Sequence, residues 1–429
     1  MFQSAVIDSS LQSEAPRKAI NKPLPFITFV LSSSIIACTM YIFAWLIGGQ
    51  VTPSISLMNV IYGAVICYAV SNILMHKLGK FPGSRPLTYL IPTVAITILV
   101  LIASINFLRL EYSRSAIAVS FSAILLITYL EFKFLQSRQQ GHYAVVPFGF
   151  FEPLLACNKD KFTLLVTPGL SNRDYSGIIV DNTADIPNHW QQFIAEALAK
   201  DTPILNAISA YESITGKSPL DHYGEITYGE LKPAPLYLML KRLIETTLII
   251  LSTPLTLPVV FLTAIAIKLE SKGPAFFTQK RVGKGGKEFS MYKLRSMCLE
   301  SEVNGAQFAG EDDPRITRIG KFIRKARIDE LPQFLNILKG NMALIGPRPE
   351  QSGFVKEFEQ VIPLYSYRHV VRPGITGWAQ VTHGYASCED TTREKLAHDF
   401  YYVKNLSLWL DFDILFKTII TMLTGFGAR

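Results

Sequence analysis

The strongest constraint on this chain is a long stretch without charge near its beginning. No Asp, Glu, Lys or Arg occurs between Pro23 and His76. A helix that crosses the hydrocarbon core of a bilayer needs about 20 apolar residues, so this stretch is long enough for two spans. Two further apolar runs follow it. The four transmembrane helices predicted from these runs lie at 24–47, 54–75, 86–108 and 115–135.

The composition favours membrane helices over the buried helices of a soluble protein. Hydrophobic residues make up 49% of the chain and charged residues 18%, whereas soluble domains carry about 25% charged residues. The net charge of +8 suits phosphate-rich partners. We therefore predict a tail at 1–22, a membrane region at 23–138 and a soluble remainder.

Basic residues predict the orientation of these spans, because cytoplasmic loops are enriched in Lys and Arg. The residues expected on the cytoplasmic side are Arg17, Lys18, Lys22, Lys77, Lys80, Arg85, Lys133 and Arg138. The basic residues in the loops on the opposite side are only Arg109 and Arg114. The tail and everything after Arg138 should thus be cytoplasmic. The five cysteines are far apart, which fits free thiols in that compartment.

The segment at 139–235 has the texture of a small α/β domain. Short apolar runs at 143–147, 162–168, 177–180 and 203–206 alternate with a helical pattern at 190–199, which predicts a parallel sheet. The first run is followed by Pro147-Phe148-Gly149-Phe150 and not by a glycine fingerprint for dinucleotides. We expect a degenerate dinucleotide-fold-like domain that binds no nucleotide and serves assembly or regulation.

A fifth apolar block, at 246–267, differs from the first four because it contains Ser252-Thr253-Pro254 and Pro258. A proline inside a helix removes a backbone hydrogen bond, and Ser or Thr hydroxyls can satisfy the freed carbonyls in lipid. Both flanks are basic. A spanning helix would expose one of these flanks outside, whereas a re-entrant helix at about 242–268 that breaks at Ser252, Thr253 and Pro254 keeps both inside.

The last domain, at 236–429, is rich in turn signals. Runs at 276–282 and 287–294 predict a β-hairpin joined by the glycine cluster at 283–286, which lacks the Gly-Lys-Ser/Thr ending of a phosphate loop. An amphipathic stretch at 406–423 carries Trp409, Phe412, Phe416 and Ile420 at helical spacing. That stretch either lies on the membrane surface or packs on the domain.

The segment at 322–340 is the most informative for chemistry. Its cations Arg324, Lys325 and Arg327 directly precede Asp329 and Glu330. We expect Asp329 to cap a helix at 330–339, because Asp is a preferred N-cap and the next turn tolerates Pro332. The positive end of a helix dipole also attracts phosphate. Plain helix capping is the alternative interpretation, and the three adjacent cations argue against it.

Further phosphate-binding candidates surround this segment. Arg348 stands between two prolines at 346–350, and a rigid guanidinium suits bidentate phosphate contact. Lys293 and Arg295 alternate along one predicted strand and should share a face. A rigid loop at 372–380 ends with Gln380.

The order of these motifs resembles the bacterial sugar transferase family, the polyprenyl-phosphate hexose-1-phosphate transferases. The resemblance covers 241–429 and rests on PAFFTQKRVGKGGKEFSMYKLRSM, DPRITRIGKFIRKARIDELPQFLNILKGNMALIGPRPE and RPGITGWAQV. It implies an α+β monotopic catalytic domain with a re-entrant membrane helix. The four spans and the small α/β domain resemble the larger members of that family.

The resemblance also implies roles for individual residues. Asp329 matches the nucleophile, and Glu330 matches the residue that helps to hold Mg²⁺. The family has Ser-Pro at the helix break, where this chain has Thr253 before Pro254 and Ser252 one residue earlier. The residues predicted to bind substrate are Lys293, Arg295, Arg324, Arg327, Arg348, Glu350 and Gln380.

The implied activity is transfer of a hexose-1-phosphate from a UDP-sugar to undecaprenyl phosphate, with release of UMP. It would proceed through a phosphosugar–aspartate intermediate and start exopolysaccharide, capsule or O-antigen assembly at the bacterial inner membrane. The lipid bilayer and a second copy of the chain are the other expected partners. Nucleic acid is not expected, because no aromatic platform accompanies the basic residues.

Two other functions stay open from the sequence alone. A membrane scaffold with a dead catalytic domain would tolerate loss of the Asp329-Glu330 pair, which is intact. An ordinary glycosyltransferase would move the sugar without its phosphate and release UDP. The hexose is also open, and the segment THGYASCED after Val381 is a candidate for its selection.

Overall fold

The computed structural model describes residues 24–48, 54–78, 86–138, 141–158, 160–170, 175–220, 234–298, 313–362, 364–382 and 389–424. The predicted tail at 1–22 and most of the THGYASCED segment, at 383–388, lie outside these residues. The chain divides into two compact units. One consists of Met1–Leu74 with Leu90–Ala210, and the other of Met75–Tyr89 with Tyr211–Arg429.

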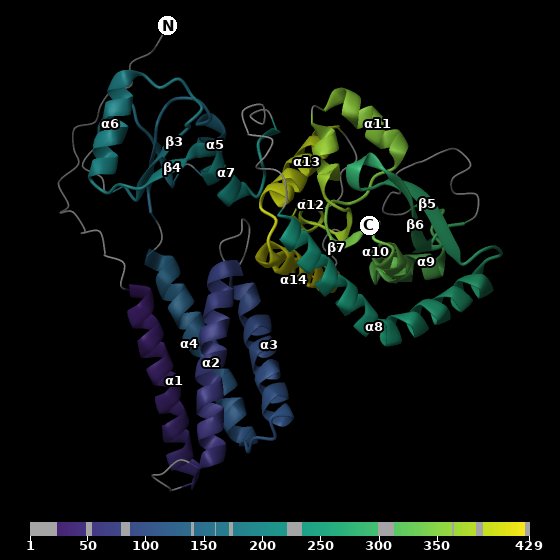
Figure 1. Ribbon diagram of the computed structural model, residues 1–429, viewed down its shortest axis with the longest axis horizontal. Coiled ribbons are helices and arrows are strands. Elements are labelled where there is room, and N and C mark those ends of the chain that lie inside the picture. The colour runs from purple at the N-terminus through teal and green to yellow at the C-terminus, as the bar shows by residue number, and fades with distance from the viewer. Residues whose placement is uncertain are drawn as a thin grey trace. The chain divides into compact units, whose positions relative to one another are not determined.

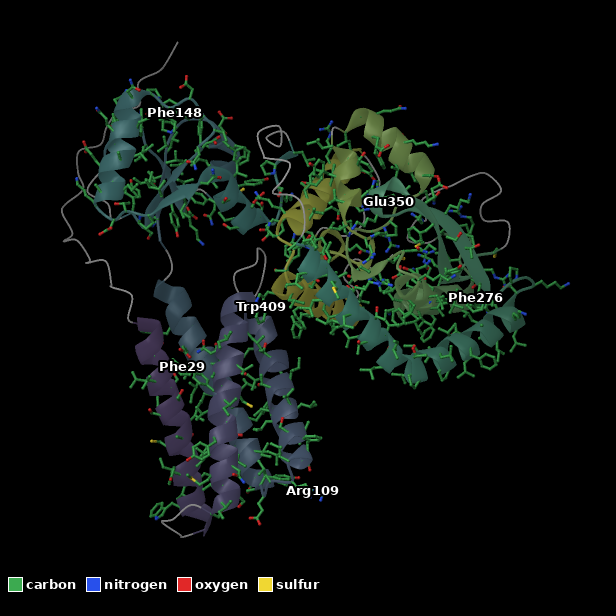
Figure 2. All side chains as sticks on the ribbon, viewed as in Figure 1. Phe29, Arg109, Phe148, Phe276, Glu350 and Trp409 are labelled. Atoms are coloured by element: carbon green, nitrogen blue, oxygen red, sulfur yellow. The ribbon has the colours of Figure 1, made fainter. Side chains whose placement is uncertain are left out.

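Four long apolar helices occupy the four predicted runs (Figure 1). They are α1 (Leu24–Gly48), α2 (Ile55–Leu78), α3 (Pro86–Phe107) and α4 (Arg114–Arg138). Within the described residues, α2 and α4 are long and apolar enough to cross a membrane, and α1 and α3 contribute the shorter apolar stretches Thr28–Phe43 and Thr93–Phe107. Figure 2 shows mainly carbon atoms along these helices. The N-terminal region is therefore helical and apolar, and the number of spans stays a prediction.

Polar side chains inside this helical region are paired with one another. The Tyr68 hydroxyl and the Asn72 amide both donate to the Glu131 carboxylate, at 2.5 and 3.1 Å. The Ser71 and Thr97 hydroxyls lie 2.9 Å apart. An unpaired polar group is costly in an apolar environment, so these contacts allow α2, α3 and α4 to carry polar residues.

The predicted parallel sheet of the small α/β domain is confirmed. Its four strands pair in the order β2-β1-β3-β4, and each pairing is parallel. The strands are β1 (Tyr143–Val145), β2 (Phe162–Leu164), β3 (Gly177–Val180) and β4 (Ile204–Asn206), and the helices are α5 (Glu152–Cys157), α6 (Asn188–Ala199) and α7 (Ala207–Thr215). Trp190 of α6 is buried against the sheet, edge-on to Phe148 and Phe193.

A carboxylate occupies the point of this sheet where a related fold would hold a phosphate. In doubly wound sheets a ligand binds where the strand order reverses, on backbone N–H groups after the first strand. Here Asp181, directly after β3, accepts from the Phe150 amide at 2.7 Å and from the Thr183 amide at 2.9 Å. A side chain at Gly149 would meet the same carboxylate at 2.2 Å. This contact supports the expectation of a degenerate fold, and the absence of nucleotide binding stays a prediction.

The end of α7 and the residues that follow it belong to the second unit. The Trp378 indole donates to the carbonyl of Gly216 at 2.9 Å, and the Ser218 amide donates to that of Ala397 at 3.0 Å. Lys404 pairs with Glu212 at 2.9 Å. The segment 211–220, which we assigned to the middle domain, thus belongs structurally with the catalytic domain.

The helix α8 (Pro235–Glu270) contains the fifth apolar block. It is long and apolar enough to cross a membrane, and Figure 1 shows that it bends near its middle. The Ser252 and Thr253 hydroxyls both donate to the Ile249 carbonyl at 2.9 Å. The helix continues through Pro254 and bends without interruption, so our prediction of a break was wrong.

A buried charge cluster fixes the beginning of α8 to the domain that follows it. Lys241 pairs with Glu245 at 3.0 Å and with Asp411, which also accepts from Tyr237 at 2.6 Å. Tyr402 donates to the second oxygen of the same Asp411 carboxylate at 2.9 Å. Each buried charge therefore has a partner of opposite sign or a hydrogen-bond donor.

The catalytic domain mixes short strands with many helices. The predicted hairpin is confirmed by the antiparallel register of β5 (Phe276–Val282) with β6 (Glu288–Leu294), and β7 (Ala343–Ile345) pairs in parallel with β8 (Gly374–Thr376). Its helical elements are η2 (Lys284–Gly286), α9 (Arg318–Lys325), η4 (Ile328–Gln333), α10 (Phe334–Leu338), α11 (Ser352–Val361), η5 (Tyr365–Val370), α12 (Trp378–Thr382), α13 (Glu389–Lys404) and α14 (Leu408–Thr424).

The helix α14 covers most of the amphipathic stretch at 406–423. Packing on the domain is confirmed for one of its faces, and contact of its exposed face with the membrane surface stays a prediction. Leu410 and Ile414 are completely buried in a core cluster with Trp378 and Tyr402. In contrast, Phe412 from the predicted apolar stripe is 46% exposed. The residues of the stripe were therefore not the ones that make the main core contact.

Removal of the cation from the α8 cluster should destabilise the catalytic domain. Lys241→Met leaves Glu245 and Asp411 as buried carboxylates without their shared cation, which costs about 3–5 kcal/mol, or roughly 6–20 °C in unfolding temperature for a domain of this size. The measurement is thermal unfolding in detergent. Lys268→Met, at the exposed end of the same helix, is the matched control, and equal shifts for both variants would contradict the account.

Candidate active site

The acidic pair lies in a short 3₁₀ turn that connects α9 with α10. Arg327 adopts a left-handed conformation, with φ 53°, and η4 begins directly after it at Ile328. Asp329 is therefore inside the first turn and not in front of it, so the prediction that Asp329 caps the helix was wrong. The reversal at Arg327 starts the helical turn at Ile328, two residues earlier than the sequence signal indicated.

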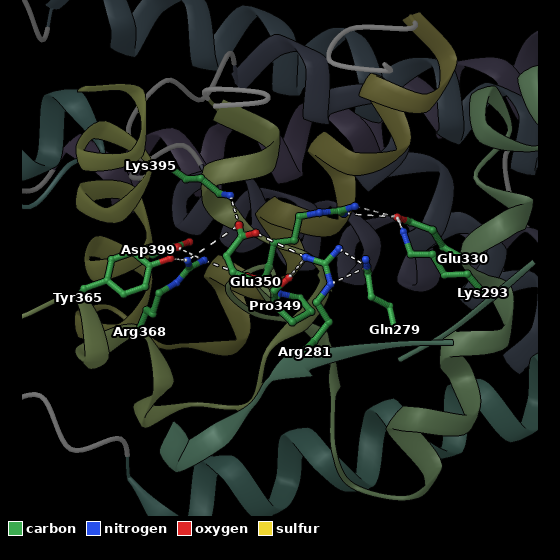
Figure 3. A network of polar contacts seen from close by, with 11 residues as sticks. Gln279, Arg281, Lys293, Glu330, Pro349, Glu350, Tyr365, Arg368, Lys395 and Asp399 are labelled. Atoms are coloured by element: carbon green, nitrogen blue, oxygen red, sulfur yellow. Dashed lines mark hydrogen bonds and ion pairs between the residues drawn. The ribbon is translucent and has the colours of Figure 1, made fainter. Parts of the chain in front are cut away.

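Both carboxylates are buried, and one of them is paired with two cations. Asp329 and Glu330 are 8% and 7% exposed. The Arg348 guanidinium approaches Glu330 Oε1 with both terminal nitrogens at 3.3 Å, and Lys293 Nζ lies 3.6 Å from the same oxygen. Glu330 Oε2 is buried without a hydrogen-bond partner in the described part of the chain. The structure thus brings Asp329 and Glu330 of η4 together with Lys293 of β6 and Arg348 of the 346–350 loop. Figure 3 shows Lys293 beside Glu330.

The two carboxylates have opposite pKa shifts. Burial and the neighbouring charge of Glu330 raise the pKa of Asp329. Burial alone would raise the pKa of Glu330 as well, but Arg348 and Lys293 outweigh it and hold that pKa below its ordinary value. Carboxyl groups whose environments separate their pKa values in this way are typical of sites where the two groups have different tasks.

The other predicted cations around the pair differ in their placement. The charge of Arg324, on α9, acts on Asp329, and that of Arg327 acts on Glu330. Both guanidinium groups therefore contribute to the positive potential at the pair. The same potential would attract the phosphates of a nucleotide sugar.

Arg295 lies elsewhere, although we expected it to share a face with Lys293. Its guanidinium donates to the carbonyls of Ser271 and Lys272, both at 2.8 Å, at the C-terminal end of α8. The strand β6 ends at Leu294, so the alternation of faces does not extend to Arg295. These contacts give the Arg295 guanidinium a structural role at the end of α8.

Glu350 and Gln380 also have contacts other than the acidic pair. Glu350 faces Arg281 at 3.6 Å, Arg368 at 4.0 Å and the Lys395 ammonium. The Gln380 amide nitrogen donates to the carbonyl of Ile375 at 3.4 Å, and its amide oxygen is buried without a partner among the described residues. Their assignment as substrate ligands stays a prediction, and for Glu350 the contacts favour a different role.

The sequence analysis missed several charged residues near the site: Arg281, Arg368, Lys395 and Asp399. One of them had a usable signal. In the hairpin, Lys293 of β6 lies directly opposite Phe277 of β5, and residues directly opposite each other point to the same face of the sheet. Arg281 is four residues after Phe277 on the same strand, so its side chain points to that face as well. The other three come from helices distant in sequence, where nothing marked them.

The donor set is compatible with a hard divalent cation. The described residues contain no group of three or more His, Cys, Asp or Glu side chains that could hold a metal alone. Mg²⁺ is commonly held by one or two carboxylates together with water and substrate phosphates. The unpartnered Glu330 Oε2 beside Asp329 fits that arrangement.

The contribution of the Glu350 carboxylate to the stability of the fold should decrease as the pH becomes acidic. Burial would raise its pKa, but Lys395 and Arg368 hold it at about 2 against an ordinary 4.5. A depressed carboxyl pKa stabilises the fold above the unfolded-state pKa and loses that effect as pH falls through the folded-state value. The difference in unfolding temperature between wild type and Glu350→Gln should be constant above pH 4.5 and shrink towards pH 2. A difference independent of pH would contradict the ion pairing.

The chain is similar to known proteins along most of its length. The sequence profile of the bacterial sugar transferase family matches residues 236–425. The chain is 45% identical over 372 residues to a UDP-N-acetylgalactosamine-undecaprenyl-phosphate N-acetylgalactosaminephosphotransferase of Aeromonas hydrophila, covering 86% of this chain and 88% of the relative.

Two further relatives match smaller parts of this chain. A UDP-glucose:undecaprenyl-phosphate glucose-1-phosphate transferase of Caulobacter vibrioides is 43% identical over 44% of this chain and 71% of its own length. A putative undecaprenyl-phosphate N-acetylgalactosaminyl 1-phosphate transferase of Bacillus subtilis is 50% identical over 31% of this chain and 74% of its own length. Together with the nearly end-to-end match to the Aeromonas protein, these similarities show that the chain belongs to the bacterial sugar transferase family.

Proposed function

We propose that this chain transfers a hexose-1-phosphate from a UDP-sugar to undecaprenyl phosphate and releases UMP. The observation that carries the proposal is the buried Asp329 carboxylate beside Glu330, whose own charge is matched by Arg348 and Lys293. Asp329 is thus less strongly paired than Glu330, and its carboxylate is available to attack a phosphorus atom. The other is surrounded by the cations that a diphosphate requires.

The proposed chemistry has two displacements at one phosphorus atom. In the first, an Asp329 oxygen attacks the sugar-linked phosphorus, and the bond to the UMP oxygen breaks with its electron pair on UMP. In the second, a phosphate oxygen of undecaprenyl phosphate attacks the same phosphorus and releases the Asp329 carboxylate. Such covalent catalysis divides one difficult transfer into two easier ones.

The positive groups of the site supply the electrostatic part of catalysis. Phosphoryl transfer depends mostly on positioning and on stabilisation of charge spread over the phosphoryl oxygens. Arg348, Lys293 and Arg324 can offset the charge of the diphosphate. Mg²⁺, held by Glu330, would add further charge neutralisation at the same oxygens. Arg348 and Lys293 already form ion pairs with Glu330. They are therefore close to the positions from which they would contact the diphosphate.

The membrane arrangement follows from where the two substrates are. A polyprenyl phosphate has its phosphate at the bilayer surface, whereas a nucleotide sugar is dissolved in the cytoplasm. We propose that α1–α4 span the inner membrane and that α8 enters and leaves on the cytoplasmic side. The exposed apolar residues of α8, among them Leu251, Leu255 and Phe261, its bend and its two basic flanks support that course.

The candidate sugar is N-acetylgalactosamine, because the relative that matches most of this chain is named for it. Glucose is the second candidate, since other relatives are named for that sugar. A product of either kind would start the assembly of a surface polysaccharide.

The direct test of the activity is nucleotide release by purified protein in detergent. The protein is incubated with Mg²⁺, undecaprenyl phosphate and a panel of UDP-sugars, and UMP and UDP are separated chromatographically. We expect lipid-dependent UMP release that Asp329→Asn lowers about 10³-fold or more, because the attacking carboxylate is lost. Asp201→Asn, an exposed residue of the small α/β domain with a left-handed backbone, is the matched control and should retain full activity.

Two outcomes would contradict the proposal. Release of UDP would indicate ordinary sugar transfer without the phosphate. No nucleotide release from any sugar by a folded protein would instead favour the scaffold hypothesis.

The course of α8 can be tested by cysteine labelling in spheroplasts. In a variant whose five cysteines are replaced by serine, a membrane-impermeant maleimide should label Leu110→Cys without permeabilisation. Lys272→Cys, after α8, should be labelled only once the membrane is opened, as should the control Lys200→Cys. Labelling of Lys272→Cys in intact spheroplasts would show that α8 spans the membrane.

A further inference from the structure

We propose that Glu350 is a positioning residue: together with Arg281, Arg368 and Lys395, it holds the 346–350 loop so that Arg348 faces Glu330. We call these four residues the Glu350 cluster. The inference rests on the proposed function only for its effect on turnover. Its structural part, the fixing of the loop, is independent of which reaction the site performs.

The backbone of the loop is held at three successive carbonyl groups. The Arg348 carbonyl accepts from Arg368 Nη2 at 2.9 Å, and the Pro349 carbonyl accepts from Arg281 Nη1 at 3.1 Å. The Glu350 carbonyl accepts from the amide of Val282 at 2.9 Å. Since proline also fixes φ on both sides of Arg348, little freedom remains in this stretch except the rotamer of Arg348 itself.

The Glu350 carboxylate holds the donors of these bonds in place. It lies 3.6 Å from Arg281 and 4.0 Å from Arg368, the two arginines that bind the loop carbonyls. Lys395 of α13 pairs with the same carboxylate, and Figure 3 shows the cluster between Glu330 on one side and Tyr365 on the other. Without this negative charge, three cations would be close together, and Asp399, which pairs with Arg368 at 2.8 Å, would offset part of their charge.

The cluster therefore connects three distant parts of the domain to one side chain. Arg281 comes from β5, Arg368 from η5 and Lys395 from α13. Arg368 is almost completely buried and also donates to the Tyr365 hydroxyl at 2.6 Å. A guanidinium fixed by this many partners gives the loop a rigid support, and preorganised charges stabilise a transition state without reorganisation.

These contacts make Glu350 a poor candidate for a substrate ligand. Its carboxylate is surrounded by protein cations, whereas the oxygen of Glu330 that could accept a further ligand has no partner among the described residues. Glu350 should thus act on substrate only through Arg348. The effect of a Glu350 substitution on turnover should therefore disappear when Arg348 is absent, which would not be expected if Glu350 only stabilised the fold.

The experiment compares wild type, Glu350→Gln, Arg348→Met and the double variant, with Glu357→Gln on the exposed face of α11 as matched control. Hydrogen–deuterium exchange of peptides that cover 344–352 reports on the loop. The kcat and KM of UMP release report on function. All measurements are made below the unfolding temperature of each variant, and Arg281→Gln serves as a second way to loosen the loop.

The proposal predicts faster exchange at 344–352 in Glu350→Gln and Arg281→Gln, and no change in Glu357→Gln. It predicts a loss of about tenfold in kcat/KM for Glu350→Gln, carried mostly by kcat. In the Arg348→Met background, Glu350→Gln should change kcat/KM less than twofold, because the residue through which it acts is gone.

Unchanged exchange in both loop variants would overturn the positioning role. A full tenfold loss in the Arg348→Met background would show that Glu350 acts on the substrate directly, and would equally overturn it. If Arg348→Met has no measurable turnover, the same comparison is made on the Kd of UDP-N-acetylgalactosamine with Mg²⁺. Failure of wild type to release UMP would refute the proposed function, while the exchange measurement would still decide whether the cluster fixes the loop.

Discussion

The structure of the catalytic domain depends on a buried carboxylate that must be matched by positive charge. Glu330 is buried, and an unpaired carboxylate in that position would be costly. The match comes from Arg348 at 3.3 Å and Lys293 at 3.6 Å, which lie on a loop and on a strand that are separate in sequence. The hairpin β5–β6 and the 346–350 loop therefore converge on one acidic turn. The same convergence leaves Asp329, one residue away, buried but less strongly paired.

The second constraint is the membrane boundary, and α8 meets it through contacts at both ends. Near its beginning, Lys241 and Glu245 form a buried cluster with Asp411 of α14. At its end, Arg295 binds the carbonyls of Ser271 and Lys272. The apolar middle of the helix is free to face lipid while its polar ends are held by the catalytic domain. In the proposed function, a bent helix fixed at both ends would guide the phosphate of the lipid substrate towards the acidic turn.

Sequence analysis predicted the local elements well and the long-range contacts poorly. The uncharged run between Pro23 and His76, the parallel strands and the β5–β6 hairpin all follow from patterns within a few residues. The errors arose where a boundary or a tertiary contact decided the outcome. The alternation of side chains along a strand could not predict where Arg295 points, because β6 ends one residue before it. The partners of Glu350 could not be predicted, because Arg368 and Lys395 are contributed by distant helices, which no spacing rule connects.

In the proposed mechanism, Asp329 is the group that carries the sugar phosphate between the two substrates. The most direct measurement is intact-protein and peptide mass spectrometry after brief incubation with UDP-N-acetylgalactosamine and Mg²⁺ in the absence of lipid. The account predicts an added sugar phosphate on the peptide that contains Asp329, which disappears when undecaprenyl phosphate is supplied. UMP formation that requires both substrates together, with no adduct on that peptide at any time, would contradict it.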